Sequence, residues 1–266
     1  MDVPSVKVPP LEAAAPSLAQ VLDLKYGPLE AAGWGPRLRS KFKYANPADW
    51  YEAYVMEKVT GETLWLDVGC GRSLFPQNDP LARLLAQRCG LLVGADPSDN
   101  IDDNPFVHQR AKCEIQDYRT DLKFDLVTLR MVAEHIRDPK STVQVLSRLV
   151  KPGGLVVIFT VWKWAPVSIL AAVTPMSVHH RLKRLAWDVQ ERDTFPVEYR
   201  MNTRKTLSRL FREGGFSEDS FYYLDDCRSS TKSRFFNTIE LMLWRFFRAL
   251  GMHYPERCIL ASYRKS

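Results

Sequence analysis

Two carboxylates and two glycines are the residues of this sequence whose types and spacing point most directly to chemistry. Asp67 ends an apolar run and is followed by Gly69 and Gly71. Glycine permits backbone angles and close approaches that a Cβ would block, so this spacing predicts a tight turn whose main chain can lie against a ligand. Asp96 ends the next apolar run, where a carboxylate can accept hydrogen bonds from the two hydroxyls of a ribose. A nicotinamide-type fingerprint requires a third glycine at position 74, which is Leu74, so an oxidoreductase of that kind is disfavoured.

Alternating strands and helices must position these residues. Hydrophobic patterns predict strands at 64–68, 90–96, near 107, and at 123–129, 155–160, 220–223 and 258–263. Between them we expect helices at 47–56, 80–88, 139–150 and 203–213, and a turn at 151–154. This alternation predicts an α/β fold with a doubly wound, mainly parallel sheet. In such sheets the ligand lies at the carboxyl ends of the strands, which is where Asp67 and Asp96 fall.

Composition narrows the class of protein without identifying it. The chain has 266 residues, 45% of them hydrophobic and 26% charged, which suits a globular protein with one elaborated domain. The net charge of +6 is mild, and much of the positive excess lies between Arg181 and Arg212. The five cysteines include no Cys-x-x-Cys pair, and residues 1–17 contain no apolar signal core. We therefore expect a cytoplasmic protein without a zinc ribbon or a disulfide framework.

Three further segments follow the glycine loop in an order that is more specific than any one of them. They are Phe124-Asp125-Leu126-Val127, Glu134-His135-x-x-Asp138-Pro139 and Leu149-Val150-Lys151-Pro152-Gly153-Gly154. Together with Asp67-x-Gly69-x-Gly71, this series resembles the small-molecule branch of the class I S-adenosylmethionine-dependent methyltransferases. The resemblance implies a Rossmann-like sheet of seven strands, the last of them antiparallel, and methyl transfer from S-adenosyl-L-methionine. Ser73 stands where the family pattern often has a third glycine.

The resemblance assigns the first cofactor-binding residues to the two predicted strand ends. Asp67 would orient the glycine loop and take the methionyl ammonium directly or through water. Gly69 and Gly71 would let the backbone lie against the methionyl and ribose parts of the cofactor. Asp96, with Pro97 after it, would hold the ribose hydroxyls.

The remaining cofactor positions implied by the resemblance lie further along the chain. Glu114 and Ile115 occupy the adenine-recognition position, and Asp117 is the rival acidic residue. Arg130 follows the fourth strand, where it would line the passage between cofactor and acceptor or bind a substrate anion. Tyr51, on the helix before the sheet, would close over the cofactor or pack in the core.

Histidines are the candidates for a catalytic base, which a hydroxyl acceptor requires. His135 belongs to a family landmark, with a structural role as the alternative, and His179 and His180 lie in the predicted cap. Adjacent histidines cannot both point inward from a helix. In one quinone-biosynthesis branch a similar Glu-x-x-Glu-His run binds a divalent metal. Here Met131 replaces the first glutamate, so we expect no metal site.

The predicted organisation is one catalytic domain with added cap elements. Residues 1–43 form an N-terminal leader or cap, and residues 44–266 form the methyltransferase domain, with a substrate cap at 161–202. The stretch 233–250 is an apolar helix that must be buried on most sides. It would roof the acceptor pocket, form a homodimer or lie on a membrane surface.

These observations predict a methyltransferase that acts on a small molecule, apolar or aromatic, by O- or N-methylation. A nucleic-acid methyltransferase is the main alternative. No Asn-Pro-Pro-Tyr-like motif follows the fourth strand and the charge is modest, so we expect no nucleic-acid partner. A cofactor-binding protein of the same fold without methyl transfer is the other alternative.

Overall fold

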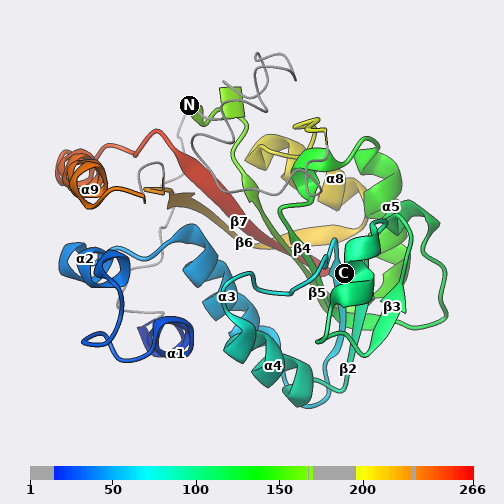
Figure 1. The fold of residues 1–266 in the computed structure, drawn as a ribbon. Coiled ribbons are helices and arrows are strands. Elements are labelled where there is room, and N and C mark those ends of the chain that lie inside the picture. Colours follow the sequence, from blue (N-terminus) through cyan, green and yellow to red (C-terminus); the bar gives the residue numbers. More distant parts are fainter. Residues whose placement is uncertain (1–14, 167, 170–195, 229–231) are drawn as a thin grey trace.

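Seven strands form one mixed sheet through the centre of the molecule (Figure 1). The structure is a computed structural model that describes residues 15–166, 168–169, 196–228 and 232–266. The strand order is β3-β2-β1-β4-β5-β7-β6, and β7 runs antiparallel to both of its neighbours while the other strands share one direction. This architecture confirms the predicted fold. The strands are β1 (Leu64–Val68), β2 (Leu91–Ala95), β3 (Gln109–Ala111), β4 (Phe124–Arg130), β5 (Val150–Val161), β6 (Phe216–Asp225) and β7 (Arg257–Lys265).

Helices cover both faces of the sheet because consecutive strand residues point to opposite sides. Trp65 belongs to the core beneath α1 (Ala15–Tyr26), α3 (Pro47–Lys58) and α4 (Asp79–Arg88). Leu66, the next residue, belongs to the core beneath α5 (Pro139–Leu149) and α8 (Arg204–Glu213). Burial on both faces explains why the central strands are almost continuously apolar. No helix in the described part of the chain is both long and apolar enough to cross a membrane.

Two further helices pack together at one end of the sheet. They are α2 (Trp34–Phe42) and α9 (Arg234–Ala249), which lie next to each other at the left of Figure 1. A small core of Leu38, Tyr44, Cys227, Leu241 and Trp244 joins them to the segment after β6. Because α9 connects β6 to the antiparallel β7, it leaves the sheet at the same edge as the loops that follow the parallel strands.

Local sequence signals set the helix starts. Asn46 and Asp49 form a reciprocal capping box at the start of α3, with Pro47 in the first turn. Asp138 accepts a hydrogen bond from the Ser141 amide at 3.1 Å at the start of α5. Helix α3 precedes β1 and α5 follows β4, so these caps fix where the helices that flank the site strands begin.

The expected turn at 151–154 was wrong. Strand β5 runs through it, because Phe124 pairs with Val150 and the next paired residues are Leu126 and Leu155. The strand bulges outward across the intervening residues and keeps its place beside β4.

The strand expected near residue 107 begins later, at Gln109. The reason is His108, whose Nδ1 accepts a hydrogen bond from the Leu92 amide at 3.0 Å. An imidazole thus takes the place of a main-chain acceptor just before the β2–β3 ladder starts. Val107 is buried beside Gly94 and outside the strand.

Candidate active site

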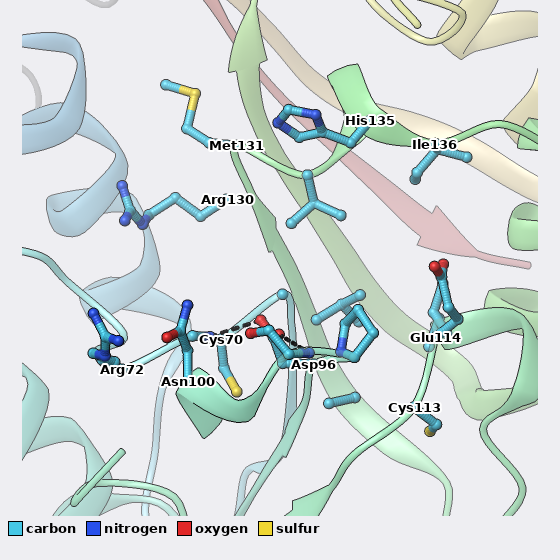
Figure 2. A pocket seen from close by; sticks show the side chains of 18 of the residues that line it. Cys70, Arg72, Asp96, Asn100, Cys113, Glu114, Arg130, Met131, His135 and Ile136 are labelled. Atoms are coloured by element: carbon cyan, nitrogen blue, oxygen red, sulfur yellow. Dashed lines mark hydrogen bonds between the residues drawn. The ribbon is translucent and has the colours of Figure 1, made fainter. Parts of the chain in front are cut away.

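A cavity of about 560 Å³ lies at the carboxyl ends of β1, β2 and β4 (Figure 2). Its volume falls within the range of roughly 300–1,000 Å³ that small-molecule sites occupy. Eight of the predicted site residues line it: Gly69, Gly71, Asp96, Pro97, Glu114, Ile115, Arg130 and His135. The topology therefore brings together residues from four separate segments of the sequence.

The loop after β1 depends on its first glycine. Gly69 has φ +69°, and a Cβ there would lie 2.3 Å from Cγ2 of Val132. Its amide donates to the Ala95 carbonyl at 2.7 Å, which ties the loop to the end of β2. Gly71 has φ +48°, and a Cβ there would meet nothing within 4 Å. Gly69 is thus required for packing against Val132, whereas at Gly71 the main chain borders an open space.

Asp96 fixes the second wall of the cavity. Its Oδ2 accepts a hydrogen bond from the Gly71 amide at 2.9 Å, and its Oδ1 accepts one from the Ser98 amide at 2.8 Å. The Ser98 hydroxyl also donates to Oδ1. Figure 2 shows Asp96 at the centre of the cavity wall, between Arg72 and Glu114. The strand-end carboxylate therefore organises the glycine loop directly.

Asn104 holds the same loop from behind and was not predicted from the sequence. Its amide group donates to the carbonyl of Gly71 at 3.0 Å, and the side chain is fully buried. The sequence gives no signal that singles it out, because Asn104 directly follows the polar residues Asp102 and Asp103.

Asp67 lies behind the cavity and is absent from its lining. Its carboxylate is buried and accepts a hydrogen bond from the Thr128 hydroxyl at 2.6 Å, while Trp65 Nε1 donates to the same hydroxyl oxygen at 2.7 Å. Burial raises the pKa of the Asp67 carboxyl to about 7. The structure therefore joins Asp67 to the β1–β4 core and keeps it off the cavity surface.

Tyr51 is likewise outside the cavity lining. Its ring is 1% exposed and stacks on Phe159 with the ring centroids 5.1 Å apart. Burial raises the pKa of the Tyr51 hydroxyl well above its ordinary value. Of the two alternatives for this residue, the structure shows the core position.

The adenine-recognition segment forms the third wall. Glu114 is exposed and Ile115 is buried, and both line the cavity. Asp117, the rival acidic residue, is exposed and does not line it. Ile115 offers the apolar surface that a flat base needs, and Glu114 offers an acceptor beside it.

The end of β4 forms the fourth wall. Met131 has φ +53°, a left-handed conformation that is uncommon for a side chain of this size. Its amide donates to the Phe159 carbonyl at 2.7 Å, which holds the residue in that conformation. Arg130 and Arg72 lie on the same side of the cavity in Figure 2. Arg137 lines it as well, so three cations surround the cavity.

Comparison with known proteins decides the family. A methyltransferase domain family matches residues 44–220, a range that includes every residue that lines the cavity. The chain belongs to this methyltransferase domain family. The family expected from the sequence is therefore confirmed.

Curated relatives are similar over part of the chain. The ubiquinone biosynthesis O-methyltransferase of Rhizobium etli (strain CIAT 652) is 34% identical over 119 residues, covering 40% of this chain and 46% of the relative. The enzyme of the same name from Leptothrix cholodnii is 30% identical over 165 residues, covering 56% of this chain and 66% of the relative. The chain thus spans about half to two thirds of the length of these relatives.

A solved structure shares the fold. Geranyl diphosphate C-methyltransferase from Streptomyces coelicolor A3(2), in complex with Mg²⁺, geranyl diphosphate and S-adenosyl-L-homocysteine, superposes with a TM-score of 0.51. The sequences are 14% identical, and the match covers 82% of this chain and 78% of that one. At this identity the likeness is one of fold alone.

In this member of the methyltransferase family, His135 is held by the segment that returns from the cap region. Its Nδ1 lies 2.8 Å from the carbonyl oxygen of Pro196. A carbonyl can only accept, so in the neutral imidazole Nδ1 carries the proton and Nε2 carries the lone pair. The contact selects the tautomer in which Nε2 is the basic atom.

Glu134 holds the same segment through its main chain. Its backbone carbonyl accepts from the amides of Glu198 at 2.6 Å and Tyr199 at 3.1 Å. Its buried carboxyl accepts from the Thr160 hydroxyl at 2.6 Å, and burial raises the pKa of this carboxyl. The Glu134-His135 pair therefore attaches the cap segment to the end of the sheet beside the cavity.

The other two candidate bases, His179 and His180, lie outside the described residues. Across the ranges that the structure describes, no group of three or more His, Cys, Asp or Glu side chains is placed to hold a metal ion. The roles assigned to the site residues stay predictions, and the geometry sorts them into residues that line the cavity and two, Asp67 and Tyr51, that do not.

Proposed function

We propose that the chain transfers the methyl group of S-adenosyl-L-methionine to a small aromatic or apolar acceptor, at a hydroxyl oxygen. The observation that carries this proposal is the cavity itself. One wall is bare main chain at Gly71 with the carboxylate of Asp96, and the opposite wall presents Met131 and His135.

The residues present fit the cofactor at the ribose position. A carboxylate has about four acceptor positions. At Asp96 the Gly71 amide takes one on Oδ2, and the Ser98 amide and hydroxyl take two on Oδ1. One position on Oδ2 is left, and rotation of the Ser98 hydroxyl releases a second on Oδ1. Two hydroxyls of one ribose can therefore be accepted without moving the main chain.

The residues also fit the two ends of the cofactor. Glu114 and Ile115 would hold the adenine, and the loop from Gly69 to Gly71 would lie against the methionyl part. When bound, S-adenosylmethionine supplies a methyl group activated on a sulfonium. The protein has to align the acceptor with that group and exclude water, because a near-attack geometry of roughly 3–3.5 Å is required.

The opposite wall favours a hydroxyl acceptor. His135 would take the hydroxyl proton at Nε2, since the Pro196 carbonyl holds the other proton on Nδ1. Arg130 and Arg137 line the same cavity and would lower the pKa of an acceptor hydroxyl by stabilising its anion. A phenol or enol, which is already weakly acidic, gains most from this arrangement. The relatives from Rhizobium etli and Leptothrix cholodnii are O-methyltransferases by name, which supports the same choice.

Calorimetry on Asp96→Ala and Asp117→Ala tests the cofactor site. We expect Asp96→Ala to weaken the binding of S-adenosylhomocysteine by about 1–3 kcal/mol, because the ribose loses its acceptors. Asp117→Ala removes an exposed carboxylate outside the cavity, so its affinity should match that of the unmodified chain. Equal affinities in all three proteins would contradict the placement.

Methyl transfer tests the acceptor class. The chain is incubated with methyl-labelled S-adenosylmethionine and either a small-molecule extract or total RNA. Label in a small phenolic or enolic product, lost in His135→Gln while cofactor affinity is kept, supports the proposal. Label in RNA would replace it with the nucleic-acid alternative, and cofactor binding without any transfer would leave a binding protein of the same fold.

A further inference from the structure

Helix α9 presents an apolar stripe to the outside of the molecule. Phe235 is 69% exposed, and Phe236 and Phe246 are each 60% exposed. Four more large apolar side chains, at 239, 242, 243 and 250, are exposed on the same helix and at its C-cap. Steps of three, four and seven residues put these positions on one side of a helix. Exposed apolar surface of this extent marks an interaction site.

The opposite side of α9 fixes the stripe in this outward orientation. Leu241 and Trp244 are buried against α2, and Trp244 Nε1 donates to Asp225 Oδ2 at 2.9 Å. Asn237 is 1% exposed and donates to the Cys227 carbonyl at 3.2 Å. Turning the apolar stripe inward would leave these polar groups without those partners, which is costly in a buried site. The stripe is therefore built to face outward.

Basic side chains flank the stripe. Arg37 and Lys41 of α2 line a groove of about 210 Å³ together with Arg234 of α9. All three are exposed, as are Arg245 and Arg248 further along α9. The sequences of α2 and α9 contain a single acidic residue, Glu240, and it is buried. The surface thus combines an apolar stripe with cations that have no exposed acidic partner on either helix.

We propose that α9, with the basic groove beside α2, docks this chain on an anionic lipid bilayer. A helix that has Phe and Leu on one side and Arg beside them lies in the interface of a membrane, where the apolar side enters the acyl boundary and the cations meet the headgroups. Pairing of two copies through the same stripe would bring the arginines of the two helices close to one another, with no exposed carboxylate on α2 or α9 to offset their repulsion. Charge therefore selects the lipid surface over a second copy.

The position of α9 relative to the cavity suggests what membrane docking would do for the enzyme. It leaves the sheet after β6, at the carboxyl edge from which the cavity loops after β1, β2 and β4 also emerge. A chain seated through α9 would have this edge toward the bilayer. An apolar acceptor that partitions into the lipid would then be near the side of the sheet that holds the cavity. The docking stands independently of the chemistry proposed for the cavity.

Vesicle co-sedimentation of the full chain tests the docking. The probes are vesicles of phosphatidylcholine alone and vesicles in which phosphatidylglycerol replaces part of it. We expect binding to the anionic vesicles that weakens as salt is raised, since exposed charges are screened. The double variant Phe235→Ser/Phe246→Ser should bind at least tenfold more weakly. Arg234→Glu/Arg245→Glu should lose a similar factor on anionic vesicles only.

The matched control reverses two charges elsewhere. Arg209 and Arg212 are exposed on α8, which precedes β6 and lies away from α9 in Figure 1, and Arg209→Glu/Arg212→Glu changes the net charge by the same amount. It should bind like the unmodified chain. Three results would overturn the proposal: no sedimentation of the unmodified chain, equal binding to neutral and anionic vesicles, or a dimer in sedimentation velocity that Phe235→Ser/Phe246→Ser converts to monomer.

Discussion

The cavity and helix α9 both lie at the carboxyl edge of the sheet, and both combine arginines with apolar side chains. These side chains face inward in the cavity and outward on α9. In the cavity, arginines and apolar side chains line a hollow between strand ends. On α9, similar side chains lie on an outward surface. The difference comes from the groups behind them. Asp96 and Asn104 hold the cavity loop from within, whereas Trp244 and Asn237 hold α9 by its inner side. In each region, buried hydrogen bonds fix the orientation of the loop or helix and therefore determine which of its side chains face the cavity or the outside.

The two leucines at 241 and 243 give the largest expected contrast. Leu241 is 0% exposed in the core between α2 and α9, and Leu243 is 49% exposed on the stripe. Leu241→Ala should lower the free energy of unfolding by about 2–5 kcal/mol, through lost burial and a cavity. Leu243→Ala should change it by no more than about 0.5 kcal/mol. Urea titrations of both variants measure the difference, and similar costs would show that the stripe is packed inside the protein.

Substitutions at Gly69 and Gly71, in the loop after β1, test which part of that loop is needed for packing and which for binding the cofactor. Gly69→Ala forces a Cβ against Val132 in a left-handed conformation, and we expect a loss of about 2–4 kcal/mol in unfolding free energy with loss of cofactor binding. Gly71→Ala meets open space, so its cost should be the backbone strain of about 1–2 kcal/mol.

Urea titration and calorimetry read out both effects. If Gly71→Ala keeps its fold and still loses all affinity for S-adenosylhomocysteine, the main chain at Gly71 lies against the cofactor. If both variants lower the free energy of unfolding by the same amount, the claim that only Gly69 is required for packing is wrong.

Much of the fold follows from local signals in the sequence. The apolar runs of β1 and β2 end at Asp67 and Asp96, and the run of β4 ends at Arg130. N-cap residues such as Asp138 mark the starts of helices. The strand order brings Asp96, Glu114 and His135 to one cavity, as the motif order indicated. The bulge in β5 and the delayed start of β3 were missed, because both depend on partners across the sheet: the Phe124–Val150 pairing and the contact of His108 with Leu92.

The orientation of a side chain at a strand end could not be predicted either. Asp67 and Asp96 each end an apolar run, and sequence patterns treat them alike. Asp67 points to the α3 side and accepts from Thr128, a residue 61 positions away, whereas Asp96 points into the loop. Only the register of β1 against β4 places Asp67 beside Thr128. The outward stripe of α9 is missed for the same reason, since burial of its other side depends on α2.

The last prediction uses this difference between the two carboxylates. The pKa of Asp67 is raised from 3.8 to about 7 by burial, so the folded chain holds a proton that the unfolded chain releases in this range. The free energy of unfolding therefore falls as pH rises between these values, by up to about 1.4 kcal/mol per pH unit, and this contribution levels off above the folded pKa. In Asp67→Asn the amide oxygen still accepts from Thr128 and nothing titrates, so the decline in stability with pH should be shallower.

Urea titrations of the unmodified chain and of Asp67→Asn at pH 5, 6, 7 and 8 measure the change in slope, with Asp117→Asn as the control for removal of one exposed charge. The Asp117→Asn slope should match that of the unmodified chain. A steeper decline in Asp67→Asn, or one that is unchanged, would mean that Asp67 is ionised in the folded protein. The distinction between Asp67, a buried support behind the glycine loop, and Asp96, a ligand-facing wall of the cavity, would then fail.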